Sequence, residues 1–433
     1  MTDVSQPMLD TKPMTRAQIV VVGIMVALNA LDGFDVLSIS FASPGIAKEW
    51  GIDRAALGWV LTMELIGMAA GSVLLGRAGD RFGRKPTALA SLVLMALGMF
   101  MVSTATSIAA LSTWRVLTGF GIGGMLAVTN AITPEVSNNE HRSMAVSLMV
   151  IGYPIGAVLG GTVVSVLLKT HDWRAIFEFG SACTALMIPL VLWLVPETPA
   201  FLLAKRPEGA LARLNHSLAK LGHVAVDTLP AVQVQSRGAF LDLFAPGMAR
   251  TTVLLTLAYF FQIIAFYFIL KWTPKIVVDM GFAPSTAGGV LIWANIGGAL
   301  GGALFGLLSR RFALKAVSLT ALVAAAVMVT VFGQSGPDLT TLTTLAFAGA
   351  FCGNAAMVGL YGLAAVAFPA SLRSSGTGFV IGVGRGGAAL GPPLAGALFA
   401  SGWSLGMVAA TISLGSLAAF AAVAGLRLPK AQA

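Results

Sequence analysis

Charged residues and cysteine are scarce in this sequence. Only 10% of its 433 residues are Asp, Glu, Lys or Arg, whereas soluble domains carry roughly 25%. Because 57% of the residues are hydrophobic and the mean hydropathy is +0.86, a soluble chain of this length could not bury its apolar surface, which excludes a soluble enzyme. The two cysteines, Cys183 and Cys352, both lie inside apolar stretches, so neither a disulfide framework nor a metal site is expected.

Apolar stretches recur along the whole chain, which excludes a peripheral or single-span protein. A spanning helix needs about 20 apolar residues, and the alternating segments of a membrane β-barrel, about 10 residues each, do not occur in the sequence. We therefore predict an all-α polytopic membrane protein with twelve transmembrane helices. The predicted spans are residues 18–44, 55–76, 86–108, 110–132, 144–168, 175–195, 251–273, 286–308, 314–333, 340–366, 376–400 and 404–426.

One long polar interruption, residues 196–250, separates six predicted spans from the other six. It predicts an N-terminal six-helix bundle at 1–195, a cytoplasmic central loop at 196–250 and a C-terminal six-helix bundle at 251–433. If both termini are cytoplasmic, 19 of the 27 cationic residues lie on the inner side and 6 on the outer side, which is the positive-inside pattern. The net charge of +9 thus reports membrane topology, and no nucleic-acid partner is expected.

The two halves of the chain share an internal repeat. Residues 76–85 follow the second predicted span and match residues 306–315 after the eighth, 230 positions later, at Gly, Arg, Phe and Lys. A second match at an offset of 231 aligns Gly156 with Gly387 within longer similar segments. Parallel repeats of six spans are typical of transporters with two pseudo-symmetric bundles and a substrate site near the middle of the membrane.

Residues 76–85, Gly-Arg-Ala-Gly-Asp-Arg-Phe-Gly-Arg-Lys, are similar to the signature loop of the major facilitator superfamily. The segment 115–121 resembles the fourth-helix motif of that family, and Glu135 followed by Arg142 resembles its cytoplasmic Glu-x6-Arg pattern. The resemblance implies the major facilitator fold, alternating access and a monomer. It also implies a cytoplasmic ion-pair gate, although these cations could instead serve topology alone. The expected gate residues are Asp80, Arg81, Arg84, Glu135 and Arg142.

A narrower resemblance lies in the first predicted span. Residues 31–35, Leu-Asp-Gly-Phe-Asp, are similar to the Asp-Gly-aromatic-Asp motif of the aromatic acid:proton symporters, and residues 382–391 resemble their arginine-bearing eleventh helix. This implies a proton-coupled transporter in the bacterial inner membrane that imports an aromatic carboxylate. Lys271-Trp272 departs from the motif of these symporters, and Tyr153-Pro154 partly resembles a motif of drug antiporters. Export of amphipathic compounds by proton antiport, or symport of a non-aromatic organic acid, therefore remains an alternative.

Three acids in the predicted spans are the candidates for proton coupling. A carboxylate at the centre of a bilayer costs at least about 2.5 kcal/mol, so Asp32, Asp35 and Glu64 need a functional or structural reason. Asp32 and Asp35 are three residues apart and share a helix face. Each can carry a proton near neutral pH, or the two can form a structural polar pair bonded to Asn29 or to another helix. Protons are the expected coupling ion, and no cofactor or metal is expected.

Two arginines in the predicted spans, Arg385 and Arg115, are candidates for substrate binding. A guanidinium stays charged and offers a planar fork that matches a carboxylate. Arg385 could alternatively form a buried structural ion pair. Arg115 could alternatively snorkel to the outer membrane interface, and it could pair with Glu64.

Aromatic and amide side chains in the spans could complete a pocket for a ring-bearing substrate, because rings stack on aromatic residues and amides orient polar groups. Most individual aromatics in a membrane bundle nevertheless face lipid or core, and buried amides also form interhelical bonds. The predicted pocket residues are Phe34, Tyr153, Gln262, Phe266, Tyr267, Trp293, Asn295, Asn354 and Tyr361.

Overall fold

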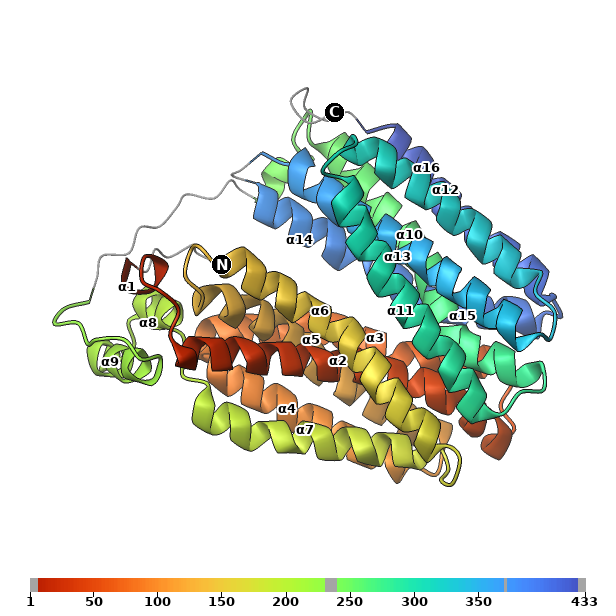
Figure 1. Ribbon diagram of the computed structural model, residues 1–433, viewed down its shortest axis with the longest axis horizontal. Helices are drawn as coiled ribbons and strands as arrows, with labels where there is room; N and C mark the ends of the chain where they lie inside the picture. The colour runs from red at the N-terminus through yellow and green to blue at the C-terminus, as the bar shows by residue number, and fades with distance from the viewer. Residues whose placement is uncertain (1–6, 230–239, 370–371, 427–433) are drawn as a thin grey trace. The chain divides into compact units, whose positions relative to one another are not determined.

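The structure is a computed structural model that describes residues 7–229, 240–369 and 372–426. These residues form helices and connecting loops, with no strand among them (Figure 1). Eleven helices are long and apolar enough to cross a membrane. They are α2 (Arg16–Trp50), α3 (Arg54–Phe82), α4 (Arg84–Ser103), α5 (Ile108–Glu135), α6 (Arg142–Leu167), α7 (Arg174–Leu194), α10 (Ala249–Asp279), α11 (Pro284–Leu308), α12 (Leu314–Gly333), α13 (Leu339–Ala367) and α16 (Leu405–Ala424).

The remaining predicted span, residues 376–400, consists of two shorter helices, α14 (Arg373–Gly384) and α15 (Gly386–Ala400), which meet at Arg385. The break follows from local sequence and packing. Glycines flank Arg385, and a Cβ atom on Gly384 would lie only 2.5 Å from the ring of Tyr259. At the break, the N–H of Ala388 donates to the Arg385 carbonyl three residues back, at 2.9 Å, which tightens the turn. The structure thus interrupts this span at the arginine that the sequence marks as functional.

The predicted central loop is partly helical. It contains α8 (Pro199–Lys205), α9 (Ala210–Lys220) and the short 3-10 helix η1 (Phe240–Phe244). Thr198 caps α8 by accepting a hydrogen bond from the Phe201 N–H at 3.4 Å. Another short helix, α1 (Pro7–Asp10), precedes the first span.

The chain forms two compact units. Unit 1 comprises residues 1–36, 63–159 and 174–235, and unit 2 comprises residues 37–62, 160–173 and 236–433. Unit 2 therefore contains parts of α2, α3 and α6 in addition to the helices of the second half. Within unit 2, Arg54 pairs with Asp279 at 2.8 Å, and Thr62 donates to the carbonyl of Ala389 at 2.9 Å. These bonds explain why residues 37–62 group with unit 2 rather than with the remainder of the predicted N-terminal bundle.

In unit 1, α4 packs along α5 and α7, and in unit 2, α11 packs along α13 and α12 along α16 (Figure 1). The internal repeat reappears in this packing. A Cβ atom on Gly156 would lie 1.8 Å from the carbonyl oxygen of Ala30, and one on Gly387 would lie 2.1 Å from that of Phe260. Both glycines let a later helix touch the first helix of its own half, since only a residue without a Cβ fits there. The aligned glycines of the sequence therefore make equivalent helix contacts.

Candidate functional site

A buried ion pair joins two helices of unit 1. Glu64 of α3 and Arg115 of α5 contact each other directly, and both side chains are 0% exposed. Arg115 also donates to the backbone carbonyl of Asp35 in α2 at 3.2 Å, and its guanidinium lies 5.5 Å from the centre of the Phe177 ring. The alternative in which Arg115 snorkels to the membrane interface is wrong, because its side chain is 0% exposed. The predicted pairing with Glu64 is confirmed.

Asp32 and Asp35 lie in the same part of α2, and both are fully buried. Neither carboxylate oxygen of Asp32 has a hydrogen-bond partner among the described residues. Asn29 donates instead to the carbonyl of Met149 at 2.7 Å, so the structural pair considered for Asn29 is not formed with Asp32. A carboxyl that is buried without a partner is stable in its neutral, protonated form. Asp32 thus differs from Glu64, which is paired with Arg115.

The glycine between these two acids has a packing role. A Cβ atom on Gly33 would lie 2.1 Å from the carbonyl oxygen of Tyr153 in α6, so α2 and α6 can only approach this closely at glycine. The next residue, Phe34, is 3% exposed. Its ring packs edge-on against that of Phe179 in α7, with ring centres 5.5 Å apart. Phe34 therefore packs in the core of unit 1. The backbone carbonyl of Tyr153 packs against Gly33, between the two acids.

An arginine–tyrosine cluster lies in unit 2. Tyr259 of α10 and Tyr361 of α13 share a hydrogen bond between their hydroxyl groups at 2.9 Å, and their ring centres are 5.6 Å apart. Tyr259 is also hydrogen-bonded to Arg385, and Tyr267 lies close enough to interact electrostatically with that guanidinium. Tyr259 is buried, whereas Arg385 and Tyr361 are exposed. The cluster therefore places one cation beside two tyrosine hydroxyls at the break between α14 and α15.

Sequence reasoning found Arg385, Tyr267 and Tyr361 but missed Tyr259. A signal was present, because the chain contains only four tyrosines. Three of them surround Arg385 in the structure, which their scattered sequence positions do not reveal.

The predicted amides of unit 2 make structural bonds. Asn295 donates to the Leu291 carbonyl of its own helix at 2.8 Å, and Asn354 donates across to the Gly298 carbonyl of α11 at 2.8 Å. Gln262 is fully buried. Its amide nitrogen lies 3.4 Å from the Gly353 carbonyl, and its side-chain oxygen has no hydrogen-bond partner among the described residues.

The two further aromatic candidates of unit 2, Trp293 and Phe266, differ in their surroundings. Trp293 is exposed. Phe266 stacks edge-on with Tyr267, at a distance of 6.0 Å between ring centres.

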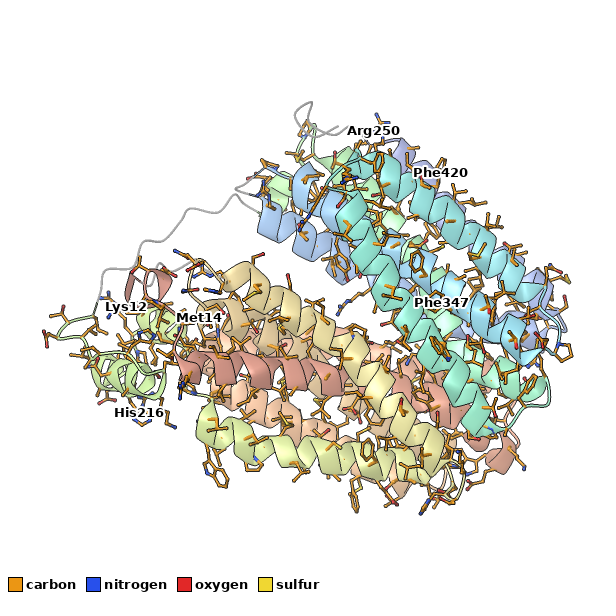
Figure 2. All side chains as sticks on the ribbon, in the orientation of Figure 1. Lys12, Met14, His216, Arg250, Phe347 and Phe420 are labelled. Atoms are coloured by element: carbon orange, nitrogen blue, oxygen red, sulfur yellow. The ribbon has the colours of Figure 1, made fainter. Side chains whose placement is uncertain are left out.

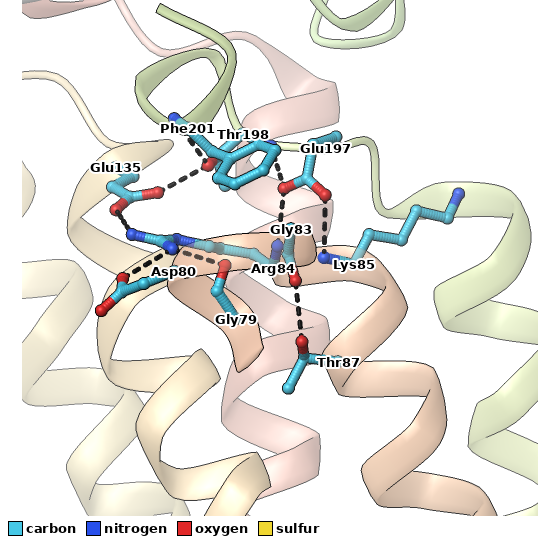
Figure 3. Close-up of polar contacts among 10 residues, drawn as sticks. All are labelled: Gly79, Asp80, Gly83, Arg84, Lys85, Thr87, Glu135, Glu197, Thr198 and Phe201. Atoms are coloured by element: carbon cyan, nitrogen blue, oxygen red, sulfur yellow. Dashed lines mark hydrogen bonds and ion pairs between the residues drawn. The ribbon is translucent and has the colours of Figure 1, made fainter. Parts of the chain in front are cut away.

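Arg84 is the centre of a polar cluster at the end of unit 1 where α3 meets α4 (Figure 3). Its guanidinium pairs with Asp80 at 2.8 Å and with Glu135 at 3.2 Å, and it donates to the Gly79 carbonyl at 2.7 Å. Glu135 also accepts a hydrogen bond from the Thr198 hydroxyl at 2.6 Å. The predicted signature loop thus connects α3, α4 and α5 with the start of α8.

Glu197 caps the start of α4 in this cluster. Its carboxylate accepts hydrogen bonds from the backbone N–H groups of Arg84 at 2.9 Å and Lys85 at 3.3 Å. Burial raises the pKa of Glu197 above its usual value, while these hydrogen bonds act in the opposite direction. Gly83 has a φ of 120°, and a Cβ atom there would lie 2.2 Å from the Glu197 carboxylate. The motif glycine is therefore required both by its backbone conformation and by the cap.

The other predicted gate residues lie outside the Arg84 cluster. Arg142 pairs with Asp10 of α1 at 2.6 Å, a partner that the sequence analysis missed. Arg81 is exposed, and its guanidinium lies 5.2 Å from the centre of the Phe82 ring. Among the described residues, no group of three or more His, Cys, Asp or Glu side chains could hold a metal ion.

Residues 25–311 match the family model described as Major Facilitator Superfamily. The chain belongs to this superfamily. It is accordingly a multi-pass membrane transporter and not an enzyme, and the predicted all-α polytopic fold is confirmed, with eleven of the twelve predicted spans present as single long helices in the described residues.

Named relatives in this superfamily include the 4-hydroxybenzoate transporter PcaK of Pseudomonas aeruginosa. It is 29% identical over 424 residues, which are 96% of this chain and 94% of that protein. The 3-(3-hydroxy-phenyl)propionate transporter of Escherichia coli is also 29% identical, over 90% of this chain and 89% of its own. These relatives confirm the narrower resemblance to transporters of aromatic acids.

A solved structure with the same fold is the inward open conformation of the xylose transporter XylE from E. coli. Its TM-score is 0.75 at 16% sequence identity, and the match covers 95% of this chain and 97% of that chain. At this identity the likeness concerns the fold alone.

Proposed function

We propose that this protein is a proton-coupled secondary transporter that imports an aromatic carboxylate. The observation that carries the proposal is the position of Arg385, which is hydrogen-bonded to Tyr259 at a break in a membrane span. The names of both relatives describe transport of a phenolic carboxylate or phenolic propionate, and such substrates suit this chemistry.

The physical argument begins with the cost of charge in a membrane. An arginine in a span faces a water-filled cavity or a ligand rather than lipid, because an unsolvated guanidinium is too costly in hydrocarbon. Its planar fork can bind both oxygens of a carboxylate. The hydroxyls and rings of Tyr259 and Tyr361 lie beside it, where they can contact a substituted aromatic ring. An aromatic acid is therefore a better fit than a simple aliphatic acid.

Proton coupling is assigned to the acids of unit 1. Asp32 is buried without a hydrogen-bond partner among the described residues, so it must gain and lose its proton when the transporter exposes it. Asp35 is the second acid on the same helix face, and Glu64 is held by Arg115. In this proposal Asp32 carries the transported proton, and the Glu64–Arg115 pair fixes the surrounding helices. An anion that enters together with protons is driven inward by a proton gradient that is acidic outside.

The experiment uses purified protein in liposomes with an imposed inward proton gradient. Uptake of labelled 4-hydroxybenzoate above equilibrium, abolished by a protonophore, is the expected result. Asp32→Asn should abolish gradient-driven accumulation and retain exchange of substrate across the membrane. Asp338→Asn, which changes an acid outside the spans, is the matched control and should accumulate normally. Efflux driven by the same gradient would instead show the antiporter alternative, and full accumulation by Asp32→Asn would overturn the coupling role.

The role of Arg385 has its own test. Arg385→Lys keeps the charge but removes the planar fork, so the substrate Kd should rise by about tenfold or more. Unchanged affinity would refute carboxylate binding by the guanidinium.

We also propose that the Arg84 cluster is a gate. It stabilises the conformation in which the transporter is closed at the end of unit 1 where α3 meets α4. Its support is the set of ion pairs from Arg84 to Asp80 and Glu135. Asp80→Asn should therefore increase the labelling of a cysteine introduced at this end. Identical labelling and transport rates would contradict the gate.

The orientation with both termini in the cytoplasm of a bacterial cell, and the monomeric state, complete the proposal. C-terminal fusions that report cytoplasmic location would test the orientation. The mass of the detergent-solubilised protein would test the monomer.

A further inference from the structure

A basic pocket of about 500 Å³ lies at the end of unit 1, among the end of α3, the start of α4, the segment after α7, and helices α8 and α9. Four of the side chains that line it are basic: Lys85, Arg213, His216 and Lys220. It is separate from the arginine–tyrosine cluster and from the buried acids of α2, and no step of the proposed transport cycle uses it.

The positive charge of the pocket is incompletely balanced. Lys85 donates to the Leu192 carbonyl at 2.6 Å and Lys220 to the Trp193 carbonyl at 3.3 Å, so both ammonium groups gather at the last turn of α7. They lie close enough to interact unfavourably with each other. The one acid in the lining, Glu197, is engaged with backbone N–H groups at the start of α4. Three permanent cations therefore face one carboxylate.

Figure 3 shows the course of the Lys85 side chain. The side chain of Lys85 extends away from the Arg84 cluster towards the neighbouring green helix, whereas the Glu197 carboxylate turns to the backbone. The ammonium group is thus directed away from the ion-pair cluster, and Lys85 is one of the residues that line the basic pocket.

Helix α9 supplies the other cations from an amphipathic surface. Leu214 and Leu218 are fully buried, which fixes one face of the helix against unit 1. Arg213, His216 and Lys220 are exposed on the helix, and Figure 2 shows His216 directed outward from it. The basic residues are therefore held in place by the burial of the opposite face.

An apolar surface adjoins these charges. The final turns of α7 expose Leu190, Leu192 and Trp193, the last with 69% of its surface accessible. Phe82, which lines the pocket, is exposed as well. Because α7 is a membrane span, its exposed apolar side chains contact lipid tails, and a tryptophan at a span end marks the level of the headgroups.

We propose that this pocket binds the headgroup phosphate of an anionic phospholipid, with the acyl chains along the exposed side of α7. A phosphodiester neutralises the ammonium groups that crowd the end of α7, and basic pockets between helix ends are known to suit such headgroups. The bound lipid connects α9 to α4 and α7, and it stabilises α9 against the rest of unit 1. Free inorganic phosphate offers the same charge but cannot use the apolar surface.

The test compares binding of phosphatidylglycerol, phosphatidylethanolamine and inorganic phosphate to the purified full-length protein by native mass spectrometry. Phosphatidylglycerol should remain bound in the mass spectra, and it should raise the unfolding temperature in a thermal melt of the same protein. Phosphatidylethanolamine and phosphate at equal concentration should do neither. Equal retention of both lipids by the wild-type protein would overturn the proposal, and stabilisation by phosphate alone would identify a free-anion site instead.

A variant pair locates the site. Arg213→Gln combined with Lys220→Gln should weaken phosphatidylglycerol binding at least about tenfold, because each cation near a membrane surface contributes to anionic-lipid affinity. Lys205→Gln removes a cation of the same loop that does not line the pocket, and it should bind like the wild type. Elution as a single monodisperse species shows that the double variant is folded. Undiminished lipid binding by that variant, or equal weakening by Lys205→Gln, would overturn the assignment.

Discussion

The buried pair of Glu64 and Arg115 permits a quantitative prediction about stability. Both side chains are 0% exposed, and Arg115 additionally donates to the carbonyl of Asp35. Arg115→Met replaces the guanidinium by an apolar side chain and leaves Glu64 buried without its counter-charge. Breaking a buried pair in this way costs about 3–5 kcal/mol, and the lost hydrogen bond to Asp35 adds about 1 kcal/mol.

The assay is unfolding of the purified protein in mild detergent by titration with SDS, followed by circular dichroism. A double-mutant cycle with Glu64→Gln isolates the pair. The double variant should be more stable than Arg115→Met alone, with an interaction free energy of at least about 2 kcal/mol, since no unpaired charge remains.

Arg54→Met is the matched control for this measurement. Arg54 also forms an ion pair, with Asp279 at 2.8 Å, but the two side chains are 41% and 26% exposed. Exposed pairs contribute about 0–1 kcal/mol, so this substitution should cost about 1 kcal/mol or less. Equal losses for Arg115→Met and Arg54→Met, or an additive cycle, would refute the argument from burial.

Three further predictions concern local packing and capping. Gly33→Ala should lower the unfolding temperature by several degrees, because its methyl group would overlap the Tyr153 carbonyl; an unchanged temperature in a thermal melt would contradict the close approach of α2 and α6. Glu197→Ala should destabilise by about 1–3 kcal/mol in the SDS titration, since it leaves the capped N–H groups of α4 without their acceptor, and Glu197→Gln should lose less. Hydrogen bonds from Thr341 lower the pKa of Asp338, so the stability that this cap contributes is present above about pH 4 and disappears as the pH falls through the lowered pKa. Asp338→Asn should remove that pH dependence in melts recorded between pH 3 and 7, and an identical pH profile would show that the carboxylate contributes nothing.

The grouping of the charged residues required the three-dimensional structure. Arg115 was expected in a pocket, at the membrane interface or paired with Glu64, and only packing shows that Glu64 and the Asp35 carbonyl contact it. Periodicity places a residue on a helix, but the rotation of that helix against its neighbours decides whether a cation meets lipid, water or an acid. Tyr259 was missed for the same reason, because its distance from Arg385 is a property of helix packing.

The sequence by itself determined that this is a polytopic helical membrane protein with a repeated half, because the length of apolar stretches and the spacing of glycines are local properties. It also determined the superfamily, through residues 76–85. Only the tertiary structure decided that the span at 376–400 breaks at Arg385, and that Arg142 pairs with Asp10. It alone revealed that Asp32 is buried without a hydrogen-bond partner in the described part of the chain. The physical reason is that the energy of a charge in a membrane depends on its immediate partners, and those partners come from helices distant in sequence.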